Sequence, residues 1–388
     1  MKKKIAILGS TGSIGNSTLE VINKNKKNFD VVLLSANDNY KKLIKQAKKF
    51  KVKNIIINNK LSYEKAKKKL KNSKIKIFSN NTPIYKIVSG KLDLTMSSIV
   101  GLAGLQPTLD AIRISKTVAL ANKEAIICGW NILKSLKKKY KTKIIPVDSE
   151  HFSIMELTKD LKNEEVEEII ITASGGPFLN TPLKKLLKVR PNQAIKHPKW
   201  KMGKKISVDS ANLMNKVFEV IEAFKLFNFD QSKYKVVIHP QSYVHSIIRF
   251  KNGLIKMILY NSDMKIPISN ILFGKKRYIC NTIKFSEKRF NNLTFKEVNT
   301  KQFPAVHLIK KILKLGPSTP TIINAANEVL VDLFLTNKIA FLDIVKVINK
   351  IIKDKEFKKY AKSTPKSIND IKKTDYWARL KTIAICVK

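Results

Sequence analysis

The first residues of this chain constrain its fold more than any other stretch. Residues 4–8 read KIAIL, an apolar run typical of a short buried strand, and residues 9–15 read GSTGSIG. A helical pattern that includes Leu19 and Val21 follows. A strand, a glycine-rich turn and a helix in this order predict the first unit of a dinucleotide-binding fold, because glycine lets the backbone approach a pyrophosphate at the start of the helix.

The spacing of these glycines would be weak evidence by itself, because glycines in a loop are often part of a plain turn. The position of the turn, between a strand and a helix, is what favours a cofactor site. Thr11 and Ser13 would add hydroxyl donors to such a site.

Further strand patterns alternate with lysine-rich amphipathic helices through the first 150 residues. The expected strands are 31–36, 54–57, 75–78, 94–100, 118–121 and 144–147. This alternation predicts an α/β fold whose N-terminal domain is a Rossmann-like, doubly wound parallel sheet.

The length of 388 residues is too great for one hydrophobic core. We expect residues 1–148 to form the Rossmann-like domain and residues 149–285 to form a central α+β catalytic domain that also binds metal and substrate and dimerises. Residues 286–388 are expected to form a C-terminal helical domain with a supporting role, because the pattern becomes helical from about Leu293.

The formal charge of +47, from 76 Lys and Arg against 29 Asp and Glu, would normally suggest nucleic acid or an anionic membrane as a partner. Here the lysines are spread over the whole chain with abundant Asn and Ile, a bias that A/T-rich codons explain. The lysine runs also lack the interleaved aromatic residues of a stacking surface. We expect no nucleic-acid or membrane partner; the alternative, a basic nucleic-acid-binding module, predicts tight and salt-sensitive binding to a random duplex.

Cys128, Cys280 and Cys386 are far apart and form no CxxC motif. This spacing indicates a reducing compartment and argues against a structural zinc site. The apolar run at the N-terminus ends at Gly9 and is too short for a signal peptide. We therefore expect a cytoplasmic protein.

The end of the second expected strand bears on cofactor choice. Residues 35–39 read SANDN. An acid at this place usually hydrogen-bonds the free ribose 2′-hydroxyl of NAD and repels the 2′-phosphate of NADP, so Asp38 argues against a strong preference for NADPH.

Carboxylates follow the last expected strand of the first domain, in the sequence PVDSEH at 146–151. Asp148 and Glu150 are two residues apart and would point the same way from an extended segment. Together with Glu219 they would form an all-oxygen site, which suits Mg²⁺ or Mn²⁺ rather than zinc. His151 could join such a site, but a histidine packed behind the loop is the simpler interpretation.

Residues 197–223 combine a loop and a helix. The loop HPKWKMGKK mixes a histidine, an indole, a glycine and several cations, a composition that predicts a lid at about 196–206. We expect a helix after Ser210, which would serve as its N-cap. The helix would carry Leu213, Val217, Val220 and Phe224 on one face and Asn212, Asn215, Lys216 and Glu219 on the other. The alternative is that Lys216 and Glu219 form an ordinary surface ion pair.

Two other motifs are ambiguous from the residues alone. Ser174 and two glycines follow a strand expected at 169–172, and they could form an anion-binding nest or a plain turn. His239, Gln241 and His245 lie in a strand-rich passage; they could be ligands, but alternating residues on a sheet surface or at a subunit contact explain them as well.

Taken in order, several motifs resemble those of the 1-deoxy-D-xylulose-5-phosphate reductoisomerases. They are GSTGSIG, LANKE, PVDSEH, SGGPF, HPKWKMG, SVDSANLMNK and HPQSYVHS, and NAANEVLVDLFL extends the resemblance towards the C-terminus. The resemblance implies an NADPH-dependent homodimer that uses Mg²⁺ or Mn²⁺, with Co²⁺ as a further candidate. The implied reaction converts 1-deoxy-D-xylulose 5-phosphate to 2-C-methyl-D-erythritol 4-phosphate in the non-mevalonate isoprenoid pathway.

The resemblance also assigns roles to residues. It makes Asp148, Glu150 and Glu219 metal ligands and, with Lys123, catalytic groups. It assigns to the substrate Ser149, Glu150, Ser174, His197, Trp200, Ser210, Asn215, Lys216 and Glu219. It assigns to the cofactor Thr11, Gly12, Ser13, Ile14, Asn37, Asn39, Asn122, Glu124 and Gly203.

This chain departs from the family at one point. Relatives often carry a glycine and a basic residue after the second strand, where Asn37 and Asp38 stand here. A plain NAD-dependent dehydrogenase is the rival interpretation. It would need the glycine-rich turn but neither the three carboxylates nor an amide-lined phosphate site.

Overall fold

The computed structural model describes residues 1–79, 82–159, 161, 164–200, 203–274 and 290–387. The chain divides into two compact units. Unit 1 comprises Met1–Ala125, Trp130–Phe152 and Asp263–Thr282, and unit 2 comprises Ile126–Gly129, Ser153–Ser262 and Ile283–Lys388. The domain boundaries expected from the sequence stay a prediction.

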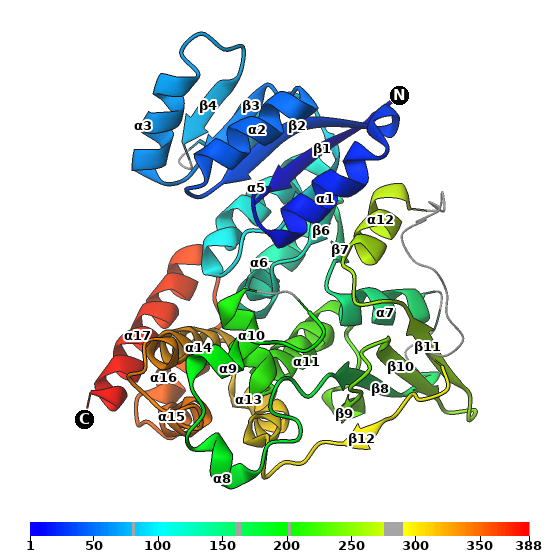
Figure 1. The fold of residues 1–388 in the computed structure, drawn as a ribbon, viewed down its shortest axis with the longest axis vertical. Coiled ribbons are helices and arrows are strands. Elements are labelled where there is room, and N and C mark those ends of the chain that lie inside the picture. Colours follow the sequence, from blue (N-terminus) through cyan, green and yellow to red (C-terminus); the bar gives the residue numbers. More distant parts are fainter. Residues whose placement is uncertain (80–81, 160, 162–163, 201–202, 275–289, 388) are drawn as a thin grey trace. The chain divides into compact units, whose positions relative to one another are not determined.

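Unit 1 is built on a seven-stranded sheet in the order β4-β3-β2-β1-β5-β6-β7 (Figure 1), in which every neighbouring pair is parallel. Its strands are β1 (Lys3–Leu8), β2 (Phe29–Ala36), β3 (Asn54–Ile57), β4 (Lys76–Ser79), β5 (Leu92–Ser97), β6 (Ser115–Leu120) and β7 (Lys143–Pro146). The predicted parallel, doubly wound sheet is confirmed.

The helices of unit 1 connect and cover these strands. They are α1 (Ser13–Asn23), α2 (Tyr40–Phe50), α3 (Lys60–Lys69), α4 (Ile84–Ile87), α5 (Leu105–Ile114) and α12 (Lys265–Phe273), with 3₁₀ turns η1 (Lys26–Asn28) and η2 (Leu102–Gly104). Helices α6 (Lys123–Tyr140) and α7 (Ser149–Leu157) contribute residues to both units.

Burial explains why the apolar run at the N-terminus forms a central strand. Ile5, Ala6 and Ile7 in β1 are fully buried, as is expected of a parallel strand covered on both faces. The chain proceeds from β1 through β2 to β4 on one side and from β5 to β7 on the other. The turn after β1 therefore lies where the strand order reverses, which is where open α/β sheets bind their ligands.

Unit 2 contains a five-stranded mixed sheet in the order β11-β10-β8-β9-β12. Strands β8 and β9 are parallel, and the other pairs are antiparallel. The strands are β8 (Val166–Ala173), β9 (Tyr234–Ile238), β10 (Val244–Phe250), β11 (Ile255–Leu259) and β12 (Lys296–Glu297).

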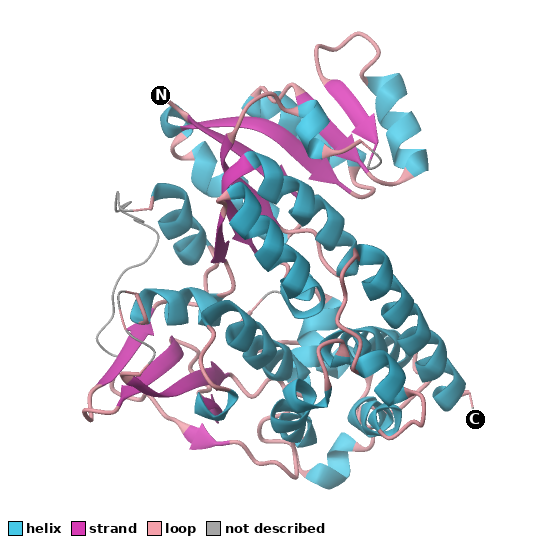
Figure 2. Cartoon of the chain, turned by 180° about the vertical axis from the view of Figure 1, so that it is seen from behind, coloured by secondary structure: helices cyan, strands magenta, loops and turns pink. Residues whose placement is uncertain are grey.

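In the sequence, some helices of unit 2 come between these strands and the others follow the last strand. Those between β8 and β9 are α8 (Leu183–Leu186), α9 (Pro191–Ala194), α10 (Lys204–Ala211), α11 (Met214–Phe227) and η3 (Gln231–Lys233). The C-terminal ones, which Figure 2 shows as a run of helices without strands, are η5 (Pro304–Leu308), α13 (Ile309–Leu315), α14 (Thr319–Leu335), α15 (Asp343–Ile352), α16 (Phe357–Ala361) and α17 (Ile368–Cys386).

The predicted helical C-terminal region is confirmed, but its expected start near Leu293 is wrong. Lys296 and Glu297 pair with Ile238 and Val237 of β9, so a short strand follows Leu293 and the described C-terminal helices begin at Pro304. Within the part of the chain that the structure describes, no helix combines the length and the apolarity that a membrane crossing needs.

Candidate functional site

The glycine-rich turn after β1 depends on the absence of side chains. Gly9 has φ +81°, and a Cβ there would lie 2.7 Å from the carbonyl oxygen of Ser98. A Cβ at Gly15 would lie 2.4 Å from the carbonyl oxygen of Gly9. Helix α1 then begins at Ser13 without a side-chain cap, so its first N–H groups have no intrahelical partner and can meet an anion.

A buried glutamine that the sequence analysis missed supports this turn. The Gln46 side-chain amide donates to the carbonyl oxygen of Ser10 at 3.0 Å and to Oδ1 of Asn16 at 3.0 Å. Ser10 Oγ in turn donates to Gln46 Oε1 at 2.8 Å. The signal in the sequence was a lone amide among the lysines of residues 41–50, next to the buried Ala47.

The end of β2 carries two of the predicted cofactor residues. Asn37 accepts a hydrogen bond from Asn58 Nδ2 at 2.9 Å, and Asn39 Oδ1 accepts one from the backbone N–H of Lys42 at 3.1 Å. Asn39 is thus the N-cap of α2. Asp38, between them, is exposed.

The start of α6 holds three more of the predicted residues. Asn122 is its N-cap, accepting from the backbone N–H of Ala125 at 2.5 Å and donating to the carbonyl oxygen of Gly101 at 2.8 Å. Glu124 is buried in the first turn. Lys123 Nζ lies 3.2 Å from Asp148 Oδ2, with side chains 11% and 24% exposed. The structure therefore brings these two predicted catalytic residues of unit 1 together.

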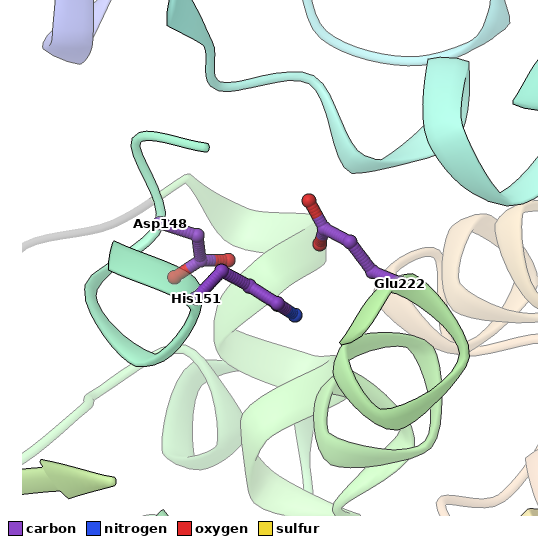
Figure 3. A group of neighbouring side chains, drawn as sticks. All are labelled: Asp148, His151 and Glu222. Atoms are coloured by element: carbon purple, nitrogen blue, oxygen red, sulfur yellow. The ribbon is translucent and has the colours of Figure 1, made fainter. Parts of the chain in front are cut away.

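We expected Asp148 and Glu150 to project from an extended segment, but this expectation is wrong because the chain turns helical here. The backbone N–H of Phe152 donates to the carbonyl oxygen of Asp148 at 2.8 Å, and α7 begins at Ser149. Candidate ligand atoms of Asp148 and Glu150 nevertheless lie within 4.8 Å of one another, and the same holds for Asp148 and His151. Ser149 Oγ donates to Glu150 Oε2 at 2.5 Å. Figure 3 draws Asp148 and His151 at the start of α7, and Glu222 on α11.

The helix predicted after Ser210 is α11, which begins at Met214, and a separate helix, α10, precedes it where a loop was expected. Ser210 lies in the last turn of α10 and is not an N-cap, and Lys204 and Lys205 are already helical. Leu213 has φ +63° and separates α10 from α11. Asn212 Oδ1 caps the second helix by accepting from the backbone N–H of Met214 at 2.9 Å.

The break between α10 and α11 has a packing cause. The side chain of Leu213 is buried with Ala173, Ile238 and Phe303, which come from the ends of β8 and β9 and from the segment before η5. This burial offsets the cost of about 1–2 kcal/mol for a left-handed residue. Asn212, placed by sequence on the polar face of the helix, instead lies in the junction.

Lys216 and Glu219 are not a surface ion pair. They are 6% and 1% exposed, and Lys216 Nζ lies 2.6 Å from Glu219 Oε2. Asn215 Nδ2 also donates to Glu219. Removing two charges from water is costly, so a buried, hydrogen-bonded pair of this kind indicates a functional site more than a contribution to stability.

Ser174 and His197 form a second polar group in unit 2. His197 Nδ1 accepts from the backbone N–H groups of Lys199 at 3.1 Å and Trp200 at 2.9 Å. Its Nε2 must therefore carry the proton and donate to Ser174 Oγ, 3.0 Å away. A Cβ on Gly176, in the turn after Ser174, would lie 3.0 Å from the carbonyl oxygen of Ser210. Without a side chain at Gly176, this turn packs closely against the end of α10.

Burial, and secondarily the positive charge of Lys216, lower the pKa of His197 to about 4. The ring should thus stay neutral between pH 5 and 8 and keep one N–H donor. Because the unfolded chain takes up this proton near pH 6.5 and the folded chain does not, the free energy of unfolding should fall as the pH drops from about 6.5 towards 4. An NMR titration of the His197 ring should give a midpoint near 4. A midpoint near 6.5 would contradict this assignment, and His197→Gln should reduce the pH dependence of stability in that window.

Trp200 is half-exposed and has a ring partner that the neighbouring sequence could not show. Its ring centroid lies 6.2 Å from that of His245, which in turn lies 4.1 Å from the ring of Tyr260. Gly203 is exposed and precedes α10. Residues 201–202 of the expected lid lie outside the described residues, so the lid at about 196–206 stays a prediction.

His239 has a structural role. Its Nδ1 donates to the carbonyl oxygen of Thr294 at 2.9 Å, and its Nε2 accepts from the backbone N–H groups of Tyr243 and Val244, both at 3.2 Å. Burial lowers its pKa, which agrees with a neutral ring. Gln241 also pairs with Thr294. Because both ring nitrogens of His239 are bonded to backbone groups, this histidine holds the turn between β9 and β10, and the structure does not favour it as a ligand.

A contact from the C-terminal helices was not predicted from the sequence. Asn327 on α14 donates to Asp209 Oδ1 on α10 at 2.7 Å, and both residues are buried. Lys205 Nζ lies 3.3 Å from the other oxygen of Asp209. The NAANE motif at residues 324–328 therefore stabilises α10, the helix that carries Ser210. This contact is one way in which the C-terminal helices support the candidate site.

The parallel sheet with a glycine-rich turn at its reversal point places unit 1 in the class of Rossmann-like, dinucleotide-binding proteins. Three family models match the chain: 1-deoxy-D-xylulose 5-phosphate reductoisomerase over residues 5–129, the C-terminal domain of the same enzyme over 144–227, and the DXP reductoisomerase C-terminal domain over 259–381. The chain belongs to the 1-deoxy-D-xylulose 5-phosphate reductoisomerase family.

Relatives and solved structures agree along the whole chain. The 1-deoxy-D-xylulose 5-phosphate reductoisomerase of Pelagibacter ubique is 46% identical over 387 residues, covering 99% of this chain and 100% of the relative. The Zymomonas mobilis enzyme in complex with NADPH superposes with a TM-score of 0.91 at 36% identity, covering 100% and 99% of the two chains. A DOX-P reductoisomerase in complex with NADPH, fosmidomycin and magnesium gives 0.93 at 30% identity, covering 99% and 98%.

Proposed function

We propose that this chain rearranges and reduces 1-deoxy-D-xylulose 5-phosphate to 2-C-methyl-D-erythritol 4-phosphate for isoprenoid biosynthesis, using NADPH and Mg²⁺ or Mn²⁺, with Co²⁺ as a further candidate. The observation that carries this proposal is the match of the family along the whole chain, at 46% identity to a relative of that name. Relatives solved with NADPH and magnesium support the choice of cofactors.

The turn after β1 fits NADPH, because its glycines allow a tight turn from strand to helix and the start of α1 has no side-chain cap, which leaves its N–H groups for a pyrophosphate. NADPH would supply the hydride. We propose that Thr11, Gly12, Ser13 and Ile14 hold its pyrophosphate with hydroxyl and backbone N–H donors. The remaining contacts are assigned to Asn37, Asn39, Asn122, Glu124 and Gly203.

The donor set fits a hard divalent cation, because Asp148, Glu150 and Glu219 offer only carboxylate oxygens. We propose that these three residues hold the metal, which would polarise the substrate carbonyl as a Lewis acid. The Lys123 ammonium, fixed beside Asp148, would lie next to the reacting hydroxyl groups.

The phosphate of the substrate would be held by residues of unit 2. Lys216 would supply the charge and His197 its neutral N–H. Ser174, Ser210 and Asn215 would add hydroxyl and amide donors. Ser149 would contact the carbon backbone, and Trp200 would cover the bound substrate and exclude water.

The direct test is oxidation of NADPH in the presence of 1-deoxy-D-xylulose 5-phosphate, with Mg²⁺, with Mn²⁺ and after metal removal. We expect turnover to stop when a chelator removes the metal and to resume when either Mg²⁺ or Mn²⁺ is added back. Turnover that persists without metal would favour a plain dehydrogenase.

We also infer that the chain forms a homodimer through β11, which is an edge strand of the five-stranded sheet. Leu254, just before β11, and Ile255 and Met257 within it are 58%, 57% and 39% exposed among the described residues, which is an unusual amount of apolar surface at an edge strand. A second copy of the same edge would cover these side chains with a two-fold interface.

Replacing Ile255 and Met257 together by Lys should therefore shift the protein from dimer to monomer in analytical ultracentrifugation, because like charges would face each other across the interface. Leu61→Lys is the matched control, since Leu61 is 72% exposed and lies on α3 in unit 1. A monomeric wild-type protein, or a double variant that remains dimeric, would refute the interface.

We infer a cytoplasmic location from the three widely spaced cysteines, which form no CxxC motif. Cell fractionation that finds the protein outside the cytoplasm would contradict this inference.

A further inference from the structure

The end of β2 poses a charge problem for NADPH. If the proposed function holds, a ribose 2′-phosphate must lie near residues 35–39, which contain Asp38 but neither Lys nor Arg. Asp38 is exposed. The side-chain oxygens of its neighbours are already used, because Asn37 accepts from Asn58 and Asn39 caps α2. The segment itself therefore supplies no cation.

Lys42 supplies a cation from the first turn of α2. Its Nζ donates to the carbonyl oxygen of Thr11 at 3.1 Å, and the side chain is half-buried. Thr11 belongs to the glycine-rich turn, which would take the pyrophosphate, whereas the backbone of Lys42 is hydrogen-bonded to Asn39 just after β2. The ammonium thus lies between the turn after β1 and the end of β2, where a bound adenosine ribose must lie.

We propose that Lys42 pairs with the 2′-phosphate of NADPH and thereby sets the preference for NADPH over NADH in spite of Asp38. The ammonium has three donors and gives one to Thr11, so two remain for phosphate oxygens. The Thr11 carbonyl also fixes the position of a long side chain, which lowers the entropy lost when the phosphate binds.

Equilibrium binding separates this role from that of a structural brace. The dissociation constants of NADPH and NADH would be measured by nucleotide fluorescence on the full chain, in wild type, Lys42→Met and Lys42→Arg. Lys41→Met is the matched control, because Lys41 is the exposed neighbour on the same turn. Loss of one charge-assisted interaction should weaken NADPH binding roughly 10- to 100-fold in Lys42→Met and leave NADH binding within about twofold.

Lys42→Arg should restore most of the preference, Lys41→Met should match wild type, and Asp38→Asn should strengthen NADPH binding without a comparable gain for NADH. Equal weakening of NADPH and NADH in Lys42→Met would show that Lys42 only braces the turn, and no weakening at all would also overturn the proposal. If the proposed function is wrong, the wild-type protein will not turn over 1-deoxy-D-xylulose 5-phosphate. The dissociation constants of NADPH and NADH do not depend on turnover, so the two failures can be told apart.

Discussion

The Asp148→Asn protein should fold and bind NADPH normally but should turn over substrate at least about 100-fold more slowly at saturating Mg²⁺. Mutation of a residue that only hydrogen-bonds a metal ligand typically lowers metal affinity or activity 10- to 100-fold. Loss of a charged ligand itself should therefore lower the activity by at least about 100-fold. The fold should survive, because Asn keeps an oxygen that can accept from Lys123 and the Asp148 side chain is 24% exposed. Steady-state kinetics over a range of Mg²⁺ concentrations and thermal unfolding measure both effects.

Glu156→Gln is the control for this substitution, since Glu156 is an exposed carboxylate on the same helix, α7. It should behave like wild type. A near-normal kcat for Asp148→Asn at low Mg²⁺ would remove Asp148 from the metal site.

Replacement of Lys216 by Met should weaken the binding of substrate and of a phosphonate inhibitor by about 1.5–3 kcal/mol, as for a lost charge-assisted hydrogen bond. Met preserves most of the buried volume. Isothermal titration would compare the phosphonate with a dephosphorylated substrate analogue, whose affinity should hardly change.

The same substitution leaves Glu219 buried without its cation, which lies 2.6 Å away in the wild type. Stability should therefore also fall, and binding must be measured at a temperature at which the variant is folded. Equal losses for the phosphonate and the dephosphorylated analogue would show that Lys216 does not contact the phosphate.

Features of unit 1 could be predicted from the sequence because their causes are local. Residues 5–8, IAIL, are all apolar and become the buried part of a central strand. The glycines of GSTGSIG are required by contacts within a few residues, such as that between Gly15 and the carbonyl of Gly9. The alternation of strands and helices then fixes a parallel sheet.

The junction between α10 and α11 could not be predicted in the same way. The apolar spacing that begins at Leu213 continues into α11, but the left-handed backbone of Leu213 is stabilised by residues from β8, β9 and the segment before η5. The contact between Asp209 and Asn327 likewise joins residues 118 positions apart. Burial of Lys216 and Glu219 depends on such long-range packing, which helical periodicity cannot distinguish from a surface position.

The proposed reaction rearranges the carbon skeleton of the substrate as well as reducing it, and the structure of the product distinguishes this reaction from plain reduction. 1-Deoxy-D-xylulose 5-phosphate would be incubated with Mg²⁺ and NADPH carrying deuterium at the transferred position of nicotinamide C4, and the product would be examined by NMR and mass spectrometry. The expected product is branched 2-C-methyl-D-erythritol 4-phosphate with one deuterium in its new hydroxymethyl group. An unbranched deoxypentitol phosphate, with deuterium on the former ketone carbon, would instead identify a plain dehydrogenase and refute the proposed function.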